Sequence, residues 1–253
     1  MKNVIITGSS NGFGLKAAKD FADKGNKVFA TMRNPNGKNA NAKADLENHS
    51  ANIKVVDMDV TNDVSVKEAM ANVVTEAGKI DILINNAGNA HGLATIQDGE
   101  IDDWDAMLDI NVKGLLYVSK AVIPQMIAQN DGFIVNIGST AGKEVYKNGN
   151  VYCASKFAVN AINKSMRLDL NDYNIRVSAI HPGLVETEFS EVRFKGDTER
   201  AKNVYAGFKP LQATDIADII HFVISRPYHV NIEDLVVFPT AQASATMIHK
   251  ENF

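Results

Sequence analysis

Seven short runs of apolar and β-branched residues recur along this 253-residue chain, and most lead into longer segments with helical periodicity. The runs lie at residues 3–8, 27–32, 53–60, 81–88, 132–139, 176–183 and 234–239. They are largely apolar instead of alternating with polar residues, which indicates strands buried on both faces. Strands that alternate with helices predict an α/β fold with a doubly wound, seven-stranded parallel sheet, helices on both faces and right-handed crossovers. Because the runs extend to the C-terminal part, residues 1–253 are expected to form a single domain.

Two segments interrupt this rhythm. Residues 33–52 are rich in Asn, Gly and Lys, which predicts a loop followed by a short, weak helix. Residues 186–207 are polar and charged, and they separate the sixth strand from the last helix. Ligands of this fold class bind beyond the carboxyl ends of the strands, so 186–207 is a candidate substrate lid. A plain surface connection remains the alternative.

The composition excludes several classes of function. A hydrophobic content of 45% and a charged content of 22% are typical of a soluble globular protein, and a net charge of −4 gives no electrostatic reason to expect nucleic acid or an anionic membrane as partner. The single cysteine, Cys153, excludes an intramolecular disulfide and fits a reducing compartment. We find no signal-peptide pattern, no apolar stretch of membrane-spanning length and no metal-ligand spacing among the six histidines. The expectation is a cytoplasmic protein without a metal.

The first apolar run leads into the sequence TGSSNGFG, from Thr7 to Gly14. Gly8, Gly12 and Gly14 follow the expected strand and open a helix. Glycines permit a tight turn and close approach of the backbone to a pyrophosphate, while the helix N-terminus supplies free N–H groups and a positive dipole end. Between the first strand and first helix of an alternating chain, this loop predicts a Rossmann-type dinucleotide site.

Tyr152 and Lys156 stand four residues apart in the segment GNVYCASKFAVNAIN, so on a helix they share one face. Alone the pair is a weak signal, because many amphipathic helices contain this spacing. A nearby cation favours tyrosinate and lowers the pKa of a phenol from about 10 toward neutrality. A tyrosine beside a lysine is therefore a candidate acid–base pair.

Several ordered motifs resemble those of the short-chain dehydrogenase/reductase family over essentially the whole chain. They are the Thr-Gly-x-x-x-Gly-x-Gly loop at 7–14, NNAG at 85–88, Asn111, Ser139, Tyr152 with Lys156, and Pro-Gly-x-Val-x-Thr at 182–187. The resemblance implies hydride transfer between a nicotinamide cofactor and a carbinol or carbonyl carbon, with Asn111, Ser139, Tyr152 and Lys156 as the catalytic tetrad. It further implies that Tyr152 exchanges the proton, Lys156 also bonds the nicotinamide ribose, Ser139 holds the substrate oxygen, and Asn111 supports a water that leads to solvent.

The motifs and their neighbours supply the residues expected to contact the cofactor. These are Gly8, Ser10, Asn11, Gly12, Phe13, Gly14, Arg33, Asp59, Val60, Asn86, Ala87, Gly88, Tyr152, Lys156, Pro182, Gly183, Val185 and Thr187. At the end of the second strand, Met32 and Arg33 stand where NAD enzymes usually place a carboxylate for the adenosine ribose. A guanidinium can pair with a 2′-phosphate, which favours NADP and leaves NAD as the alternative.

The C-terminal third resembles one branch of the family more than the others. The segments EFSEVRFKGD (188–197) and PYHVNIEDLVVFPTAQASA (227–245) are similar to those of bacterial and yeast NADP-dependent 3-hydroxy acid dehydrogenases, which also oxidise serine. The resemblance implies a small 3-hydroxy acid or serine-like substrate. Such a carboxylate needs a cation, and Arg193 or Lys195 on the expected lid is a candidate partner.

Other functions remain open at this point. A 3-ketoacyl thioester or a general ketone would suit the same chemistry with an apolar lid. A non-catalytic NADP-sensing protein on the same fold is the alternative from a different class. The resemblance also implies a homotetramer that associates partly through the helices holding Asn111 and Tyr152.

Overall fold

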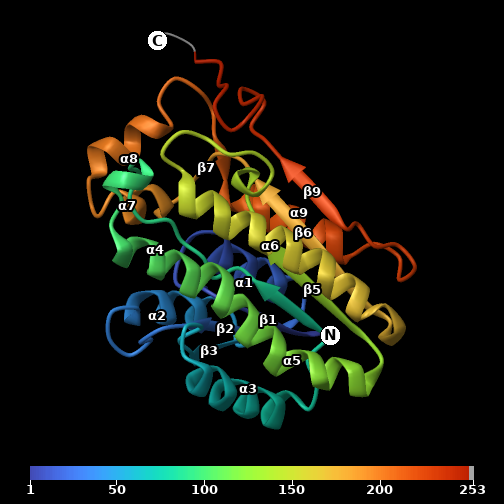
Figure 1. The fold of residues 1–253 in the computed structure, drawn as a ribbon. Coiled ribbons are helices and arrows are strands. Elements are labelled where there is room, and N and C mark those ends of the chain that lie inside the picture. The colour runs from blue at the N-terminus through green and yellow to red at the C-terminus, as the bar shows by residue number, and fades with distance from the viewer. Residues whose placement is uncertain (251–253) are drawn as a thin grey trace.

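A computed structural model of the chain describes residues 1–250, and its centre is a sheet of seven parallel strands (Figure 1). The order across the sheet is β3–β2–β1–β4–β5–β6–β9. The strands are β1 (Asn3–Ile6), β2 (Lys27–Met32), β3 (Ile53–Asp57), β4 (Ile82–Asn85), β5 (Gly132–Ile137), β6 (Ile175–Pro182) and β9 (Asp234–Val237). The strand order reverses direction between β1 and β4, and this switch point is where open α/β sheets form a ligand crevice.

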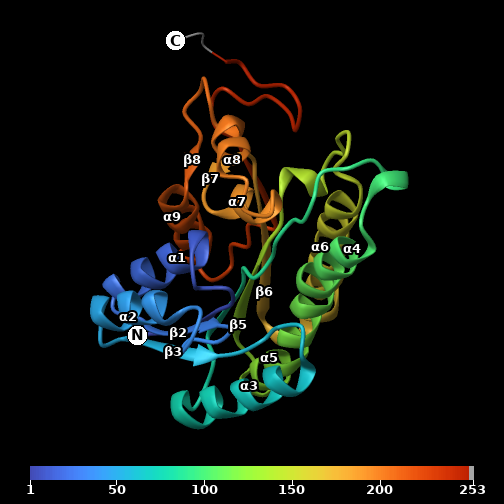
Figure 2. The same ribbon diagram turned by 90° about the vertical axis from the view of Figure 1, so that its left-hand side faces the viewer.

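Helices cover both faces of the sheet, as the alternation of the sequence predicts. The helices are α1 (Gly12–Asp23), α2 (Ala40–His49), α3 (Asp63–Ala77), α4 (Ile101–Leu108), α5 (Leu115–Gln129), α6 (Asn150–Asp169), α7 (Phe189–Arg193), α8 (Thr198–Val204) and α9 (Ala213–Ile224). Figure 2 shows α1, α2 and α9 on one side of the sheet and α3, α5 and α6 on the other. A π-helical segment (Asp109–Gly114) joins α4 to α5, and short 3-10 turns occur at Ile96–Asp98, Thr140–Gly142 and Asn171–Tyr173.

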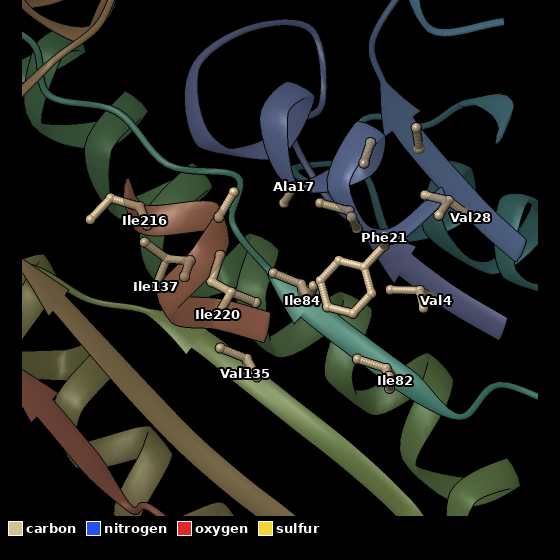
Figure 3. Close-up of a cluster of buried hydrophobic side chains, with 14 of the residues drawn as sticks. Val4, Ala17, Phe21, Val28, Ile82, Ile84, Val135, Ile137, Ile216 and Ile220 are labelled. Atoms are coloured by element: carbon tan, nitrogen blue, oxygen red, sulfur yellow. The ribbon is translucent and has the colours of Figure 1, made fainter. Parts of the chain in front are cut away.

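One large apolar core lies on each face of the sheet, and a smaller cluster that includes Tyr152 and Cys153 lies apart from them. Alternate residues of β1 enter opposite cores: Val4 and Ile6 face α1 and α9, whereas Ile5 faces α3 and α5. Figure 3 shows the first core, in which Phe21 of α1 and Ile220 of α9 pack over the strands. Helices cover both faces of the inner strands. Both sets of alternating side chains are therefore buried, which explains why these strands are apolar throughout.

The seven predicted strands are all present, but most end before their apolar run does. The first run was expected to reach Gly8, yet β1 ends at Ile6 and Gly8 adopts a φ of +67°. The run at 81–88 ends as a strand at Asn85, and the run at 132–139 at Ile137. The polar and glycine residues that follow these strand ends lie outside the sheet, and they form the loops at its carboxyl-terminal edge.

The predicted weak helix within 33–52 is α2, whose only buried residue is Leu46. The segment 186–207 contains α7 and α8, which stand above the carboxyl ends of the strands (Figure 2). A two-residue strand at its root, β7 (Val185–Glu186), pairs in parallel with β8 (Leu211–Gln212). Within residues 1–250, no helix combines the length and apolar character needed to cross a bilayer.

Candidate active site

The loops that follow β1 and β4 are tied together at the switch point. The hydroxyl of Thr7 accepts hydrogen bonds from the backbone N–H groups of Asn86 (3.0 Å) and Ala87 (2.9 Å). In return, the side-chain amide of Asn86 donates to the carbonyls of Thr7 (2.8 Å) and Gly8 (3.0 Å). A Cβ at Gly8 would lie 2.8 Å from the Cα of Ala87, so only glycine allows this approach. The two motifs therefore build one rigid edge.

The glycine loop opens the N-terminus of α1 toward this edge. A Cβ at Gly14 would lie 2.6 Å from the side-chain nitrogen of Asn86. The N-cap residue of α1, Asn11, makes no side-chain cap, so the N–H groups of Phe13 and Gly14 have no side-chain acceptor there. Uncapped N–H groups and the positive end of the helix dipole fit the pyrophosphate of a dinucleotide. The side chain of Ser10, half-buried beside this turn, accepts and donates no hydrogen bond within residues 1–250.

The predicted 2′-phosphate contact lies at the exposed end of β2. The side chain of Arg33 is 61% exposed, and its Nη1 lies 3.9 Å from the carboxylate of Asp59. That carboxylate is turned by two hydrogen bonds from Thr61, through the backbone N–H (3.0 Å) and the hydroxyl (2.8 Å). Val60 is buried against Gly114. The structure thus places Arg33, Asp59 and Val60 together, with the guanidinium free to turn toward an anion.

Tyr152 and Lys156 lie one turn apart on α6 and are both buried, with 8% and 6% exposure. The ammonium group of Lys156 donates to the carbonyl of Ile137 at the end of β5 (3.0 Å). A Cβ at Gly88 would lie 3.4 Å from this nitrogen, so the glycine of NNAG keeps the space beside it open. Ammonium groups donate three hydrogen bonds, and the remaining donors of Lys156 fit ribose hydroxyls.

The electrostatics of this pair differ from the prediction that lysine lowers the tyrosine pKa. Burial raises the pKa of Tyr152 above its usual value, and the nearby Tyr146 adds to the increase. The groups that oppose this shift in Tyr152 pKa are Ser139, through a hydrogen bond, and the guanidinium of Arg193. Burial also lowers the pKa of Lys156, to about 8. In the protein alone, therefore, desolvation outweighs any attraction between the two side chains.

Ser139 and Asn111 approach the pair from two other elements. Ser139 follows β5 and caps the turn Thr140–Gly142, where its hydroxyl accepts from the N–H of Ala141 (3.1 Å). Asn111 lies in the π-helical segment, 2% exposed. Its amide exchanges hydrogen bonds with the backbone of Asn89 (2.8 Å both ways) and donates to the hydroxyl of Ser155 (3.0 Å). Asn111 thereby fixes the loop after NNAG to the helix that holds Tyr152.

The segment expected at the nicotinamide runs from the end of β6 into β7. The N–H of Gly183 bonds the carbonyl of Val237 (2.7 Å), and the carbonyl of Val185 accepts from the hydroxyl of Tyr205 (2.9 Å). Pro182 is the last residue of β6. A Cβ at Gly12 would touch the methyl group of Thr187 at 3.7 Å, so this segment faces the glycine loop.

A cleft of about 590 Å³, part of it open to solvent, is lined mainly by residues 91–107 and 148–150, together with Tyr152, Arg193 and Lys195. Arg193 crosses it: its guanidinium lies 5.5 Å from the ring centres of both Tyr152 and Tyr146. Its Nε donates to the carbonyl of Gly92 (3.2 Å), whose N–H in turn bonds the carbonyl of Arg193 (3.0 Å). Lys195 instead pairs with Asp103 of α4 (2.9 Å) at the rim of the cleft. Of the two predicted cations, the structure places Arg193 against the tyrosine.

Sequence reasoning missed two aromatic residues beside Tyr152 and two residues that line this cleft. Phe189 packs its ring 5.7 Å from that of Tyr152, and Tyr146 shares the guanidinium of Arg193. Gly92 and Asp103 hold the two cations of the segment. Tyr146 stands only six positions before Tyr152, which is the one local signal that pointed to it. The others come from distant parts of the chain and carry no motif.

Comparison with known proteins gives consistent results. The family model for short chain dehydrogenases matches residues 2–198. The NADP-dependent 3-hydroxy acid dehydrogenase YdfG of Salmonella typhi is 40% identical over 249 residues, covering 98% of this chain and 99% of the relative. The NADP-dependent 3-hydroxy acid dehydrogenase of Schizosaccharomyces pombe is 37% identical over 251 residues, covering 99% and 97%.

Solved structures agree with these relatives. The closed form of a serine dehydrogenase complexed with NADP+ superposes with a TM-score of 0.92 at 38% identity, covering 98% of this chain and all of that one. A serine dehydrogenase from Escherichia coli gives a TM-score of 0.81 at 35% identity, covering 95% of this chain and 99% of that one. The glycine loop, the tied switch point and the buried tyrosine–lysine pair thus occur in a chain that belongs to the short-chain dehydrogenase family.

Proposed function

We propose that this protein is an NADP-dependent oxidoreductase that acts on the CH–OH group of a small 3-hydroxy acid or a serine-like molecule. The observation that carries the proposal is the guanidinium of Arg193, which lies 5.5 Å from the ring of Tyr152. A 3-hydroxy acid has its hydroxyl carbon close to its carboxylate, so the two groups require a proton-exchanging side chain beside a cation. Tyr152 and Arg193 provide that combination.

NADP is the proposed cofactor because the chain offers a cation and no free carboxylate at the end of β2. Arg33 is exposed there, while Asp59 is held by Thr61. Asn11 and Ser10, on the turn before α1, would add hydrogen bonds to the phosphate. Bound NADP would accept or supply the hydride in this reaction.

The protein's own groups would handle the proton and the substrate oxygen. Tyr152 would exchange a proton with that oxygen, and Ser139, close to the phenol, would hold the oxygen by a hydrogen bond. Lys156 would bind ribose hydroxyls, and its charge would favour tyrosinate once the site is filled. Asn111 would keep the loop of Asn89 in place around them.

The proposed substrate position has a direct physical basis. The guanidinium of Arg193 uses Nε for Gly92 and also hydrogen-bonds the phenol of Tyr146, and its remaining N–H groups would serve a carboxylate. An acyl thioester has no such anion next to its reactive carbon, and an apolar lid would suit it better. The guanidinium of Arg193 beside Tyr152 therefore favours the small acid.

A substrate screen tests the proposal. Purified protein with NADP+ should oxidise serine, 3-hydroxybutyrate or 3-hydroxyisobutyrate, followed by absorbance of the reduced cofactor, and neutral alcohols of matched length should react more slowly. Preference for a ketoacyl thioester in the reverse direction would replace the substrate assignment. NADP+ binding without turnover of any compound would instead indicate a sensing protein.

We further propose a homotetramer in the cytoplasm. The helices next to the site carry exposed apolar side chains, among them Leu116 of α5 and Phe157 of α6, at 42% and 40% exposure. Exposed apolar side chains on neighbouring elements are typical of association surfaces. Light scattering after size exclusion should give about four times the 27.5 kDa chain mass; a monomer would contradict this state.

A further inference from the structure

His181 is fully buried between the proposed site and the far strand β9. It lies in β6, directly before Pro182, and has no exposed surface. Its Nδ1 lies 3.3 Å from the backbone carbonyl oxygen of Ser139. Its Nε2 lies 3.5 Å from a carboxylate oxygen of Asp234, which also forms an ion pair with Lys143. Lys143, Asp234 and His181 thus lie in sequence next to the carbonyl of Ser139, the proposed substrate-holding residue.

The imidazole extends the pairing of β5 and β6 beyond the last strand residues. Regular pairing ends at Ile137 with Ile180, and the N–H of Gly138 still bonds the carbonyl of Ile180 (2.8 Å). One step further, the side chain of His181 takes over the contact to Ser139. A Cβ at Gly138 would collide with this ring, so glycine is required for the imidazole to reach that carbonyl.

The imidazole of His181 lies between two acceptors, the carbonyl of Ser139 and the carboxylate of Asp234, and its protonation state decides how many of them it can serve. Burial lowers the pKa of His181, and the ammonium of Lys143 lowers it further, so the ring is neutral at physiological pH. The other charged groups that face it are Asp234, which raises the pKa, and Lys156, which lowers it. A neutral imidazole donates from one nitrogen only.

The geometry indicates which nitrogen carries the proton. Nδ1 is within hydrogen-bond distance and alignment of the Ser139 carbonyl, whereas Nε2 has no hydrogen-bond partner within residues 1–250. An unpaired carboxylate beside Nε2 would attract the proton to that side. Lys143 engages Asp234 and also bonds Asn160 (3.2 Å), which offsets this attraction.

We propose that His181 is a positioning residue, held by the Lys143–Asp234 ion pair as the neutral tautomer with its proton on Nδ1, and that it fixes Ser139 through its backbone carbonyl. Because His181 directly precedes Pro182 and Gly183, the same bond sets the distance between the proposed nicotinamide segment and the proposed substrate-holding hydroxyl. This inference rests on the proposed role of Ser139.

The tautomer is measured without cofactor or turnover. The full chain labelled with 15N in its histidines should show, in long-range 1H–15N spectra, one neutral ring protonated at Nδ1 that disappears in His181→Gln. In Lys143→Met this ring should lose that signature, because the freed carboxylate draws the proton to Nε2. A wild-type ring protonated at Nε2, or identical spectra for wild type and Lys143→Met, would overturn the proposal.

Kinetics separate positioning from simple filling of space. Asparagine carries an N–H group near the position of Nδ1, and glutamine carries one near Nε2. Loss of one hydrogen bond is expected to reduce kcat roughly tenfold in His181→Gln, while His181→Asn stays within about threefold of wild type and NADP+ affinity changes little in both. If His181 only filled space, His181→Gln would keep a higher kcat than His181→Asn, because glutamine is closer in volume to histidine.

The outcomes also distinguish this inference from the proposed function. Equal activity of His181→Asn and His181→Gln, or lower activity of His181→Asn, overturns the positioning role even if the wild-type enzyme oxidises hydroxy acids. If the wild type turns over no substrate, the proposed function fails, and the spectra of the ligand-free chain still decide the tautomer.

Discussion

Lys156 is a cation that folding removes from water, and this has a cost in stability. Burial lowers its pKa from 10.5 to about 8. Between these two values the unfolded chain binds more protons than the folded protein, so stability rises with pH over that interval. Below pH 8 both states are protonated, and the penalty for the buried charge is fully present.

We therefore expect Lys156→Met to stabilise the ligand-free protein at pH 7 while abolishing turnover. The gain should be up to about 3 kcal/mol for the relieved charge, reduced by about 1 kcal/mol for the hydrogen bond to Ile137. Urea unfolding at pH 7 and pH 10 measures it, and the gain should shrink at the higher pH. Lys164→Met, on the exposed face of the same helix, is the matched control. A destabilised Lys156→Met protein at pH 7 would contradict the argument.

The role of Tyr152 can be tested by removing only its phenolic oxygen. Tyr152→Phe keeps the ring packed on Phe189 but removes the proton donor, so kcat should fall by about 10²- to 10⁴-fold with little change in NADP+ affinity. Steady-state rates and calorimetric titration measure the two quantities. Turnover within tenfold of wild type would exclude Tyr152 as the proton-exchanging group.

Arg33 carries the proposed choice between the two nicotinamide cofactors. Its side chain faces solvent, and within residues 1–250 it forms one ion pair, with Asp59 at 3.9 Å. Arg33→Ala should weaken NADPH binding roughly 10- to 100-fold, because a charge-assisted contact to phosphate is lost. NADH binding should change far less. Lys38→Ala, an exposed cation in the same connection, serves as control, and equal losses for both cofactors would remove Arg33 from this role.

At the scale of the elements, a line of buried amides crosses from β4 to α6 beneath the site. Asn85 donates to Asn136 of β5 (2.9 Å), and Asn136 donates to Asn163 of α6 (2.9 Å). Asn85 also donates to the hydroxyl of Ser119 on α5 (3.0 Å). The three amides are at most 4% exposed. They fix the register of two strands and one helix in an otherwise apolar interior.

Asn136→Leu should test this line, because leucine keeps the branching of asparagine but forms no hydrogen bonds. The amide oxygen of Asn163 would lose its donor and the amide nitrogen of Asn85 one of its two acceptors, and the larger side chain must fit a closed interior, so unfolding free energy should fall by about 2–4 kcal/mol. Denaturant unfolding measures the loss, and Asn203→Leu on the exposed face of α8 should change it little. A loss below that of the control would show that the amides contribute nothing to stability.

The elements were predictable from the sequence where local periodicity decides them. All seven sheet strands follow from apolar runs, and Tyr152 and Lys156 follow from helical spacing. The strand ends were not predictable, because Gly8 leaves the sheet through a tie between Thr7 and Asn86, 79 residues away. The π-helical turn at Asn111 was not predictable either. It occurs together with the hydrogen bonds between the amide of Asn111 and the backbone of Asn89. The short pair β7–β8 has too few residues for any pattern.

At the scale of the whole molecule, contacts between remote segments build the walls of the cleft. Arg193 of α7 bonds Gly92, 101 positions earlier, and Lys195 bonds Asp103 of α4. No sequence motif indicates that residues so far apart in the chain form these contacts. The sequence identified both cations as candidates, but only the fold distinguishes the one that faces Tyr152 from the one at the rim.

Arg193→Met tests this distinction. Removing the guanidinium should reduce kcat/KM for a 3-hydroxy acid about 10- to 100-fold, the effect of losing a charge-assisted hydrogen bond. A neutral alcohol of the same length should be affected much less. Lys195→Met removes the same charge from the same segment and should preserve the preference for acids. Equal effects of both variants would assign the selectivity to net charge alone.

The ties between the loops of β1 and β4, and the position of 186–207 outside the seven-stranded sheet, have a consequence for how such a chain diverges. The edge built by Thr7 and Asn86 accepts almost no change, since each residue satisfies the backbone of the other segment. The segment around Arg193 supplies no strand to that sheet, so its sequence can change without breaking the pairing of the sheet. Selection on this chain would therefore alter the range of accepted metabolites long before it altered the cofactor.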